Sequence, residues 1–169
     1  MTVPIFKDDR FITDAWRDLT EGAELPPAGP FVLSFSQWQA LHPKPSRDRL
    51  LGLRIEPGQD LEVLASDFAR FALIAITFHK FTDGRGYSLA HQLRSAYGFT
   101  GELRARGEIL FDQLQFLARC GFDSFEIVDP STLKLLENGR RPRLGIFYQP
   151  GLGPEVSGTA RPWVRRATP

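Results

Sequence analysis

The segment from His79 to Ser88 is the part of this sequence in which chemistry is easiest to place. It reads His-Lys-Phe-Thr-Asp-Gly-Arg-Gly-Tyr-Ser, so one titratable ring, one carboxylate, two cations and two glycines follow each other closely. The glycines would let the backbone approach a ligand and adopt positive φ, and the cations would attract negative charge. An expected helix directly behind them offers unpaired N–H groups. We therefore predict that a small anion, such as phosphate, sulfate or carboxylate, binds at Lys80, Gly84, Arg85 and Gly86.

Two side chains of the same segment, His79 and Asp83, could carry a proton. Histidine changes its charge near neutral pH, so His79 could act as a general acid or base, and either His79 or Asp83 is the candidate proton carrier for a bound anion. A structural reading stays open, in which Asp83 caps the helix and pairs with Arg85 while His79 is a hydrogen-bonded residue at a strand end. The segment matches neither a Walker loop nor a GxGxxG turn.

Two further arginines, Arg104 and Arg106, alternate with apolar residues and should therefore share one face of a strand. We include both among the anion-binding candidates. With Arg54 they would lie opposite Glu56 and Glu126 on neighbouring strands. Such a group is either a network of ion pairs or a place where an anion binds, because buried charges are costly unless they are fully paired.

Strands that alternate with helices must position these residues. The patterns predict a small hairpin over 3–12 and then strands over 31–35, 51–55, 73–78, 102–106 and 123–128, with a last strand over 144–148. Between them we expect helices after Ser36 as N-cap, after Asp60 as N-cap to about 68, and over 87–97, 108–120 and 131–136. Alternating elements of this kind indicate an α/β fold with a mainly parallel sheet.

The expected strands are apolar on one side and polar on the other. Leu53, Ile74 and Leu103 are typical of the first side, and Arg54 and Arg104 are typical of the second. A doubly wound sheet would be apolar on both sides, so the pattern favours singly wound (βα) repeats in a partial or distorted TIM-barrel-like arrangement. Its polar concave face would be open, or covered by the tail, the hairpin or a second subunit, and ligands would bind at the carboxyl ends of the strands.

Composition and charge bound the remaining possibilities. The 169 residues are 42% hydrophobic and 24% charged, which fits one α/β domain over 1–150. From Asn138 onward there are six arginines and one acid, so we expect 151–169 to be a disordered basic tail. The remainder carries a net charge of −4, which makes nucleic-acid binding through the tail a distant alternative.

The single cysteine, Cys120, excludes an internal disulfide, a multi-cysteine metal site and an iron–sulfur cluster within one chain. We expect its thiol to be buried and inert. The three histidines are scattered and suggest no metal site, and no motif indicates a cofactor. No apolar run is long enough to span a membrane and no secretory signal is visible, so we expect a cytoplasmic protein without a membrane partner.

Several long stretches resemble one bacterial family. They are Lys80–Ser88, Gly101–Gly107, the run from Leu110 through Arg119-Cys120-Gly121-Phe122-Asp123 to Glu126, Tyr148-Gln149-Pro150, and Asp14 with Trp16. In these residues the chain resembles the "domain of unknown function 934" family, often labelled an oxidoreductase of sulfite reduction, over about 3–150. The resemblance carries no established catalytic residues.

The resemblance implies cytoplasmic work in sulfate assimilation and cysteine biosynthesis, beside sulfite reductase. Because no redox centre or cofactor motif is visible, we expect an accessory protein that binds sulfite reductase or its electron donor. The alternative is an enzyme or sensor that binds a small anion, such as sulfite, sulfate or phosphate, at the strand ends. A homodimer is compatible with either.

Overall fold

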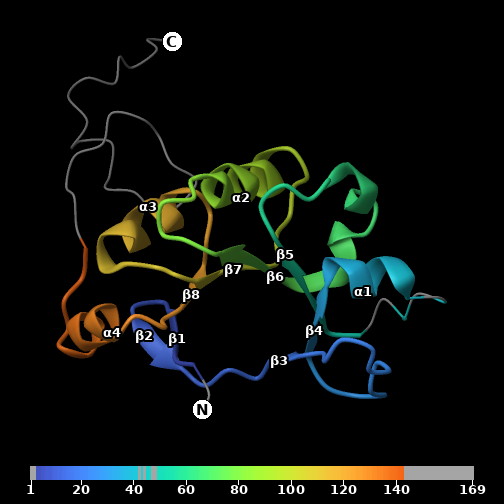
Figure 1. The fold of residues 1–169 in the computed structure, drawn as a ribbon, viewed down its shortest axis with the longest axis horizontal. Coiled ribbons are helices and arrows are strands. Elements are labelled where there is room, and N and C mark those ends of the chain that lie inside the picture. The colour runs from blue at the N-terminus through green and yellow to red at the C-terminus, as the bar shows by residue number, and fades with distance from the viewer. Residues whose placement is uncertain (1–2, 42, 44, 47–48, 143–169) are drawn as a thin grey trace, which may run out of the picture.

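An eight-stranded sheet, curled into a half-barrel, forms the body of the protein in a computed structural model (Figure 1). The structure describes residues 3–41, 43, 45–46 and 49–142. The strands are β1 (Ile5–Lys7), β2 (Arg10–Ile12), β3 (Arg17–Asp18), β4 (Phe31–Ser34), β5 (Leu51–Ile55), β6 (Phe71–Phe78), β7 (Glu102–Gly107) and β8 (Ser124–Glu126). Their order across the sheet is β2-β1-β8-β7-β6-β5-β4-β3.

The sheet is mostly parallel, as the sequence predicts. The five pairs from β3 to β8 across the sheet are parallel, whereas β1 pairs antiparallel with both β2 and β8. The predicted N-terminal hairpin is therefore present as β1 and β2. Asp8 and Asp9 form its two-residue turn with φ values of 49° and 61°, which suits a tight hairpin because Asp tolerates positive φ.

In the described part of the chain, four α-helices follow the strands, with three 3₁₀ turns between them. They are α1 (Phe35–Ala40), α2 (Arg85–Ser95), α3 (Leu114–Arg119) and α4 (Pro130–Glu137), and the 3₁₀ turns are η1 (Glu62–Leu64), η2 (Phe68–Arg70) and η3 (Phe111–Gln113). Local chemistry fixes two of the helix starts. Ser34 Oγ accepts the N–H of Gln37 while Gln37 Oε1 accepts the N–H of Ser34, a capping box. Asp129 caps α4 by accepting the N–H of Thr132 at 2.6 Å, directly before Pro130.

All four helices pack on the same, convex face of the sheet. One core cluster joins Leu53, Ile74 and Leu103 of the strands to buried residues of every helix, among them Trp38 and Leu93. These five side chains are completely buried. The predicted α/β fold with a mainly parallel sheet is therefore correct, and the apolar strand residues lie under the helices.

Some predicted boundaries are wrong. The segment after Asp60 forms η1 and η2 instead of one α-helix, because an apolar spacing of three to four residues fits successive 3₁₀ turns as well. Asp60 accepts a hydrogen bond from the N–H of Glu62 and so starts the first turn. The helix predicted over 108–120 begins at η3, since the N–H of Glu108 is bonded to the carbonyl of Phe78.

The N-cap of the first helix was misplaced as well. It is Ser34 rather than Ser36, which lies inside α1. The predicted strand over 144–148 and the predicted disordered tail over 151–169 both lie outside the described residues.

One segment crosses the concave face. β2 is at one edge of the sheet and β3 is at the other, so the residues between Ile12 and Arg17 must run from edge to edge (Figure 1). We call residues 13–18, which include β3, the crossing segment. It covers the polar side of the half-barrel, which the sequence left either open or covered by another element.

Candidate functional site

A cavity of about 220 Å³ lies between the concave face of the sheet and the crossing segment. Charged residues from three parts of the chain line one side of it. The crossing segment contributes Asp14 and Asp18, β7 contributes Arg104 and Arg106, and β8 contributes Glu126. We call this space the concave cavity.

Arg104 is the centre of the first group of charges. Its Nη1 lies 2.8 Å from Asp14 Oδ2, and its Nη2 lies 2.9 Å from Glu102 Oε1. Glu102 also accepts hydrogen bonds from Lys7 Nζ at 2.6 Å and from Ser124 Oγ at 2.6 Å. Burial raises the pKa of Glu102, but these hydrogen bonds and the charge of Arg104 outweigh it, so the pKa lies below its ordinary value. Glu102 is therefore ionised at neutral pH.

Arg106 is the centre of the second group. Its two terminal nitrogens bind both oxygens of Asp18, at 2.9 and 3.0 Å, and its Nε lies 3.1 Å from Glu126 Oε2. Asp18 also lies 3.5 Å from Arg54 Nη1. Burial lowers the pKa of Arg106, but the hydrogen bonds to Asp18 and the charge of Glu126 raise it by more. The pKa therefore lies above its ordinary value, and this guanidinium keeps its charge.

Glu126 differs from the other acids of the cavity. Burial raises the pKa of its carboxyl, and the attraction of Arg106 offsets this only in part. Its side chain is 14% exposed and lines the cavity. Glu126 therefore takes up a proton more readily than an ordinary glutamate does, a property that recurs at functional sites.

Apolar residues form another part of the lining of the concave cavity, here called the apolar wall. Trp16 of the crossing segment packs on a small cluster formed by Val32, Leu73 and Ala75, which are nearly fully buried. These three residues lie on the concave side of β4 and β6, where we predicted polar residues. The cavity thus has one charged and one apolar wall.

His79 follows β6 on the same face as Thr77 and lies at the carboxyl end of the sheet. Its Nε2 is 3.3 Å from Glu56 Oε2, and both side chains are largely exposed, at 60% and 46%. Thr77 stands beside Arg106 in the strand register. His79 thus belongs to the rim at the strand ends, with a carboxylate beside it that can orient the ring.

The loop after His79 is held by contacts within the chain. The N–H of Phe81 donates to Glu108 at 3.0 Å, and the carbonyl of Phe81 accepts from Gln113 at 2.7 Å. Arg85 binds Asp83 through Nε at 2.9 Å and Nη2 at 2.7 Å. Hydrogen bonds from Arg85 lower the pKa of Asp83 to about 2, so this carboxyl is ionised near neutral pH. His79 is the better candidate proton carrier of the two.

Gly84, the N-cap of α2, and Gly86, in its first turn, have different structural roles. Neither has the positive φ that the sequence led us to expect. A Cβ on Gly86 would lie 2.5 Å from the ring of Phe78, so this glycine permits close packing of α2 on β6. A Cβ on Gly84 would meet nothing within 4 Å. Lys80 is exposed at the start of the loop.

The structure therefore divides the predicted site residues into two groups. Arg104 and Arg106 line the concave cavity, whereas Lys80, Asp83 and Gly84 precede α2, and Arg85 and Gly86 are its first two residues. No hydrogen bond or ion pair between described residues joins the two groups. Each guanidinium that we expected to hold an anion is already paired with a carboxylate of the protein.

Sequence reasoning missed the partners supplied by the first 18 residues. Asp14, Asp18 and Trp16 all contribute to the concave cavity. The family resemblance had singled out Asp14 and Trp16, and nothing in the sequence had singled out Asp18. A signal was available in the strands: Val32, Leu73 and Ala75 break the polar side of the pattern. Such a break indicates that something apolar covers that face.

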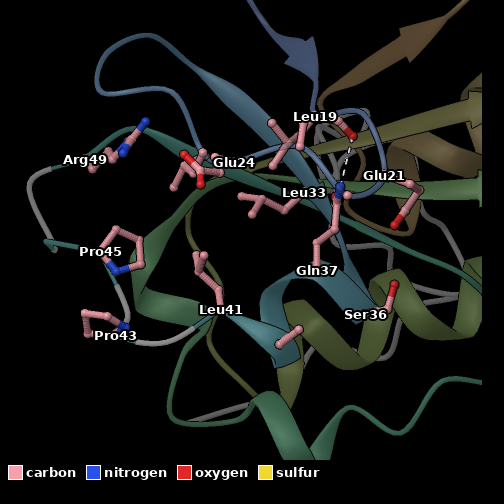
Figure 2. A pocket seen from close by; sticks show the side chains of 14 residues that line it. Leu19, Glu21, Glu24, Leu33, Ser36, Gln37, Leu41, Pro43, Pro45 and Arg49 are labelled. Atoms are coloured by element: carbon pink, nitrogen blue, oxygen red, sulfur yellow. Dashed lines mark hydrogen bonds between the residues drawn. The ribbon is translucent and has the colours of Figure 1, made fainter.

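A larger groove of about 670 Å³ lies beside α1 (Figure 2). The side chain of Gln37 holds one wall in place by donating to the carbonyls of Leu19 and Thr20, at 3.2 and 3.0 Å. Arg49 donates to the carbonyl of Pro26 and holds the same loop. Leucines, prolines and alanines form most of the lining, so this groove suits apolar contacts better than a charged ligand.

Comparison with protein families decides the kinship of the chain. A family model described as "Bacterial protein of unknown function (DUF934)" matches residues 52–157, more than half of the sequence. The chain belongs to this family. The match covers β5 to α4 of this DUF934 protein, and hence Arg104, Arg106 and Glu126, but begins after the crossing segment. No similar protein was found among curated sequences or among solved structures.

Two further findings concern what the DUF934 protein could hold. Among the residues that the structure describes, no group of three His, Cys, Asp or Glu side chains is arranged to bind a metal ion. The helices found in that part of the chain are too short or too polar to cross a membrane. Cys120 is half-buried, and burial raises the pKa of its thiol, which disfavours the reactive thiolate.

Proposed function

We propose that this protein is an accessory protein of assimilatory sulfite reduction that binds a small charged metabolite in the concave cavity. The observation that carries the proposal is the placement of Arg104, Arg106 and Glu126 around one cavity of about 220 Å³. Cavities that combine an apolar wall with a few convergent polar groups are the usual ligand sites of proteins. The sulfur-assimilation role rests on the family resemblance.

The position of this cavity supports ligand binding over a purely structural role. A structural ion-pair network gains nothing from empty space, because buried charges are most stable when they are tightly packed and fully hydrogen-bonded. The crossing segment instead spans the sheet and leaves room beneath it. The helices lie outside and the polar face lies inside, which supports a kinship with (βα)-barrels, whose ligands bind at the carboxyl ends of the strands.

Ligand binding can be tested by thermal unfolding of the full chain with sulfite, sulfate, phosphate and small amino acids. A ligand present at a hundredfold excess over its Kd should raise Tm by about 5 °C or more. Arg106→Gln should abolish the shift. Arg141→Gln is the matched control, since Arg141 pairs with Asp9 at the surface. If no compound shifts Tm, the cavity does not bind a ligand of this class.

The pathway is tested separately in a strain that lacks the gene. We expect slower sulfite-dependent growth and lower sulfite-reductase activity in extracts, restored by the wild-type protein and not by Arg106→Gln. A physical complex with sulfite reductase or its electron donor is the partner that this role implies, and co-purification tests it. Equal activity with and without the gene would refute the accessory role while leaving ligand binding intact.

A second candidate function is catalysis, and the contact between His79 and Glu56 favours it. A carboxylate 3.3 Å from the imidazole can fix its tautomer, as an orienting acid does for a general base. A ligand that extended from the cavity to the strand ends would meet this pair. Product formation by the wild-type protein, lost in His79→Gln while ligand binding persists, would establish an enzyme. A turnover rate that is unchanged in this variant would exclude His79 as the proton carrier.

A further inference from the structure

The concave cavity has the size, shape and charge of a site for a small zwitterion, an inference that rests on the proposed ligand binding there. Its volume of about 220 Å³ equals the space of roughly seven water molecules. That suits a ligand of about six to eight non-hydrogen atoms and is below the usual range for drug-sized ligands. A nucleotide or an adenylylated anion is larger than this volume.

The charges around the cavity are balanced, and this balance favours a ligand without net charge. Arg104 is paired with Asp14 and Glu102, and Glu102 also binds Lys7. Arg106 is paired with Asp18 and Glu126, and Asp18 also approaches Arg54. Four cations therefore face four carboxylates. A bare anion would add an uncompensated charge to a partly buried site, which is costly. A ligand with one positive and one negative group adds none.

Asp18 can release Arg106 at little electrostatic cost. It binds Arg106 through both oxygens, but its side chain is 43% exposed and it already lies 3.5 Å from Arg54. When a ligand carboxylate replaces Asp18 at the two terminal nitrogens of Arg106, Asp18 still has Arg54 as a cationic partner. The fork geometry of Arg106 suits a bidentate carboxylate.

We propose that the concave cavity binds a free α-amino acid with a small apolar side chain. The ligand carboxylate replaces Asp18 on the guanidinium of Arg106, and the ligand ammonium binds Glu126, which lies on the Nε side of the same guanidinium. The small side chain lies against Val32, Leu73 and Trp16, on the apolar wall.

Each part of this arrangement predicts a preference that can be measured by calorimetric titration of the full chain. L-Alanine and L-valine should bind. Propionate lacks the ammonium group and alaninamide lacks the carboxylate, so each should bind at least about tenfold more weakly. L-Phenylalanine tests the volume of the cavity and should also bind at least about tenfold more weakly.

Variants locate the site. Glu126→Gln keeps the size of the side chain and should weaken L-alanine binding at least about tenfold while the circular dichroism spectrum stays that of the wild type. If that variant does not fold, Asp18→Asn serves instead. Asp18→Asn weakens the pair between residue 18 and Arg106, so a ligand carboxylate replaces it more easily and L-alanine should bind more tightly. Unchanged binding of L-alanine in the folded variants would place its site elsewhere and overturn the inference.

The titration panel separates this inference from the proposed function. Binding of sulfite, sulfate or phosphate without binding of the amino acids would refute the zwitterion and leave small-anion binding in the cavity as the function. Binding of propionate as strong as that of L-alanine would refute the role of the ammonium group. If neither the amino acids nor the anions bind, both the inference and the proposed ligand binding fail.

Discussion

Arg104 and Asp14 are 90 positions apart in the sequence, and their side chains form a buried ion pair with Nη1 and Oδ2 2.8 Å apart. Only 5% and 16% of the two side chains are exposed. The pair attaches the crossing segment to the middle of the sheet and thereby forms one wall of the concave cavity. Stability and site geometry thus depend on the same contact.

Asp14→Asn should destabilise the protein by about 2 to 4 kcal/mol, because removal of one partner leaves a buried guanidinium incompletely paired. Denaturant titration measures this as a lower midpoint with an unchanged slope. Asp9→Asn is the matched control. Asp9 pairs with Arg141 at 2.9 Å but is 69% exposed, so its loss should cost no more than about 1 kcal/mol. Equal costs for the two variants would contradict a structural role of the crossing segment.

Glu126→Gln should make the ligand-free protein more stable at neutral pH. Because the pKa of Glu126 is raised in the folded protein, the folded protein binds a proton at this carboxyl more tightly than the unfolded chain does. The favourable contribution is complete below the ordinary value of 4.5 and is lost as pH rises through the raised value. The stability advantage of the variant should therefore shrink as pH falls from 7 towards 4.5. A variant that is less stable at every pH would show that the pair with Arg106 dominates.

The carboxyl of Asp83 should titrate near pH 2 in the wild-type protein and at a higher pH, still below its ordinary value of 3.8, in Arg85→Gln. The variant loses the side-chain hydrogen bonds that lower the pKa most, but it keeps the bond from the backbone N–H of residue 85. Since the folded-state pKa is depressed, the contribution of this pair to stability is present above pH 3.8 and is lost as pH falls through about 2. Nuclear magnetic resonance titration of the carboxyl measures both values. A pKa that stays low in the variant would mean that another group, such as His79, controls it.

Gly86→Ala and Gly84→Ala form a matched pair at the start of α2. A Cβ at position 86 would lie 2.5 Å from the ring of Phe78, so this change should cost about 1 to 3 kcal/mol. Position 84 is open and has a φ of −71°, so alanine there should change stability by no more than about 0.5 kcal/mol. Thermal unfolding of both variants checks this. If Gly84→Ala impaired ligand binding without loss of stability, the loop would belong to the ligand site after all.

The sequence was sufficient to predict most of the sheet. The alternation in residues such as Leu53 and Arg54 reflects burial on one side only, and this is a local property that neighbouring residues record. The helix after Asp60 was misjudged for a related reason: α-helical and 3₁₀ turns can present the same apolar spacing. Boundaries of that kind depend on contacts with other elements.

The candidate site was predicted only in part. Arg104 and Arg106 were identified because they alternate on one strand. Their partners Asp14 and Asp18 come from a segment with no regular pattern, and they reach the arginines only because β2 and β3 occupy opposite edges of the sheet. Non-local pairing of this kind leaves no periodic trace in a single sequence.

The crossing segment also has a consequence for the order of assembly. β1 pairs with β8, and Asp14 cannot meet Arg104 until the intervening 90 positions have been synthesised, which takes roughly 5 to 20 seconds on a ribosome. Until then the earliest strands and Trp16 lack their native neighbours, and unpaired strand edges and exposed apolar side chains favour association with other chains. The first part of the chain to emerge is thus among the last to settle. Completion of the sheet and creation of the cavity become one event, so a nascent, half-folded chain does not yet contain the concave cavity.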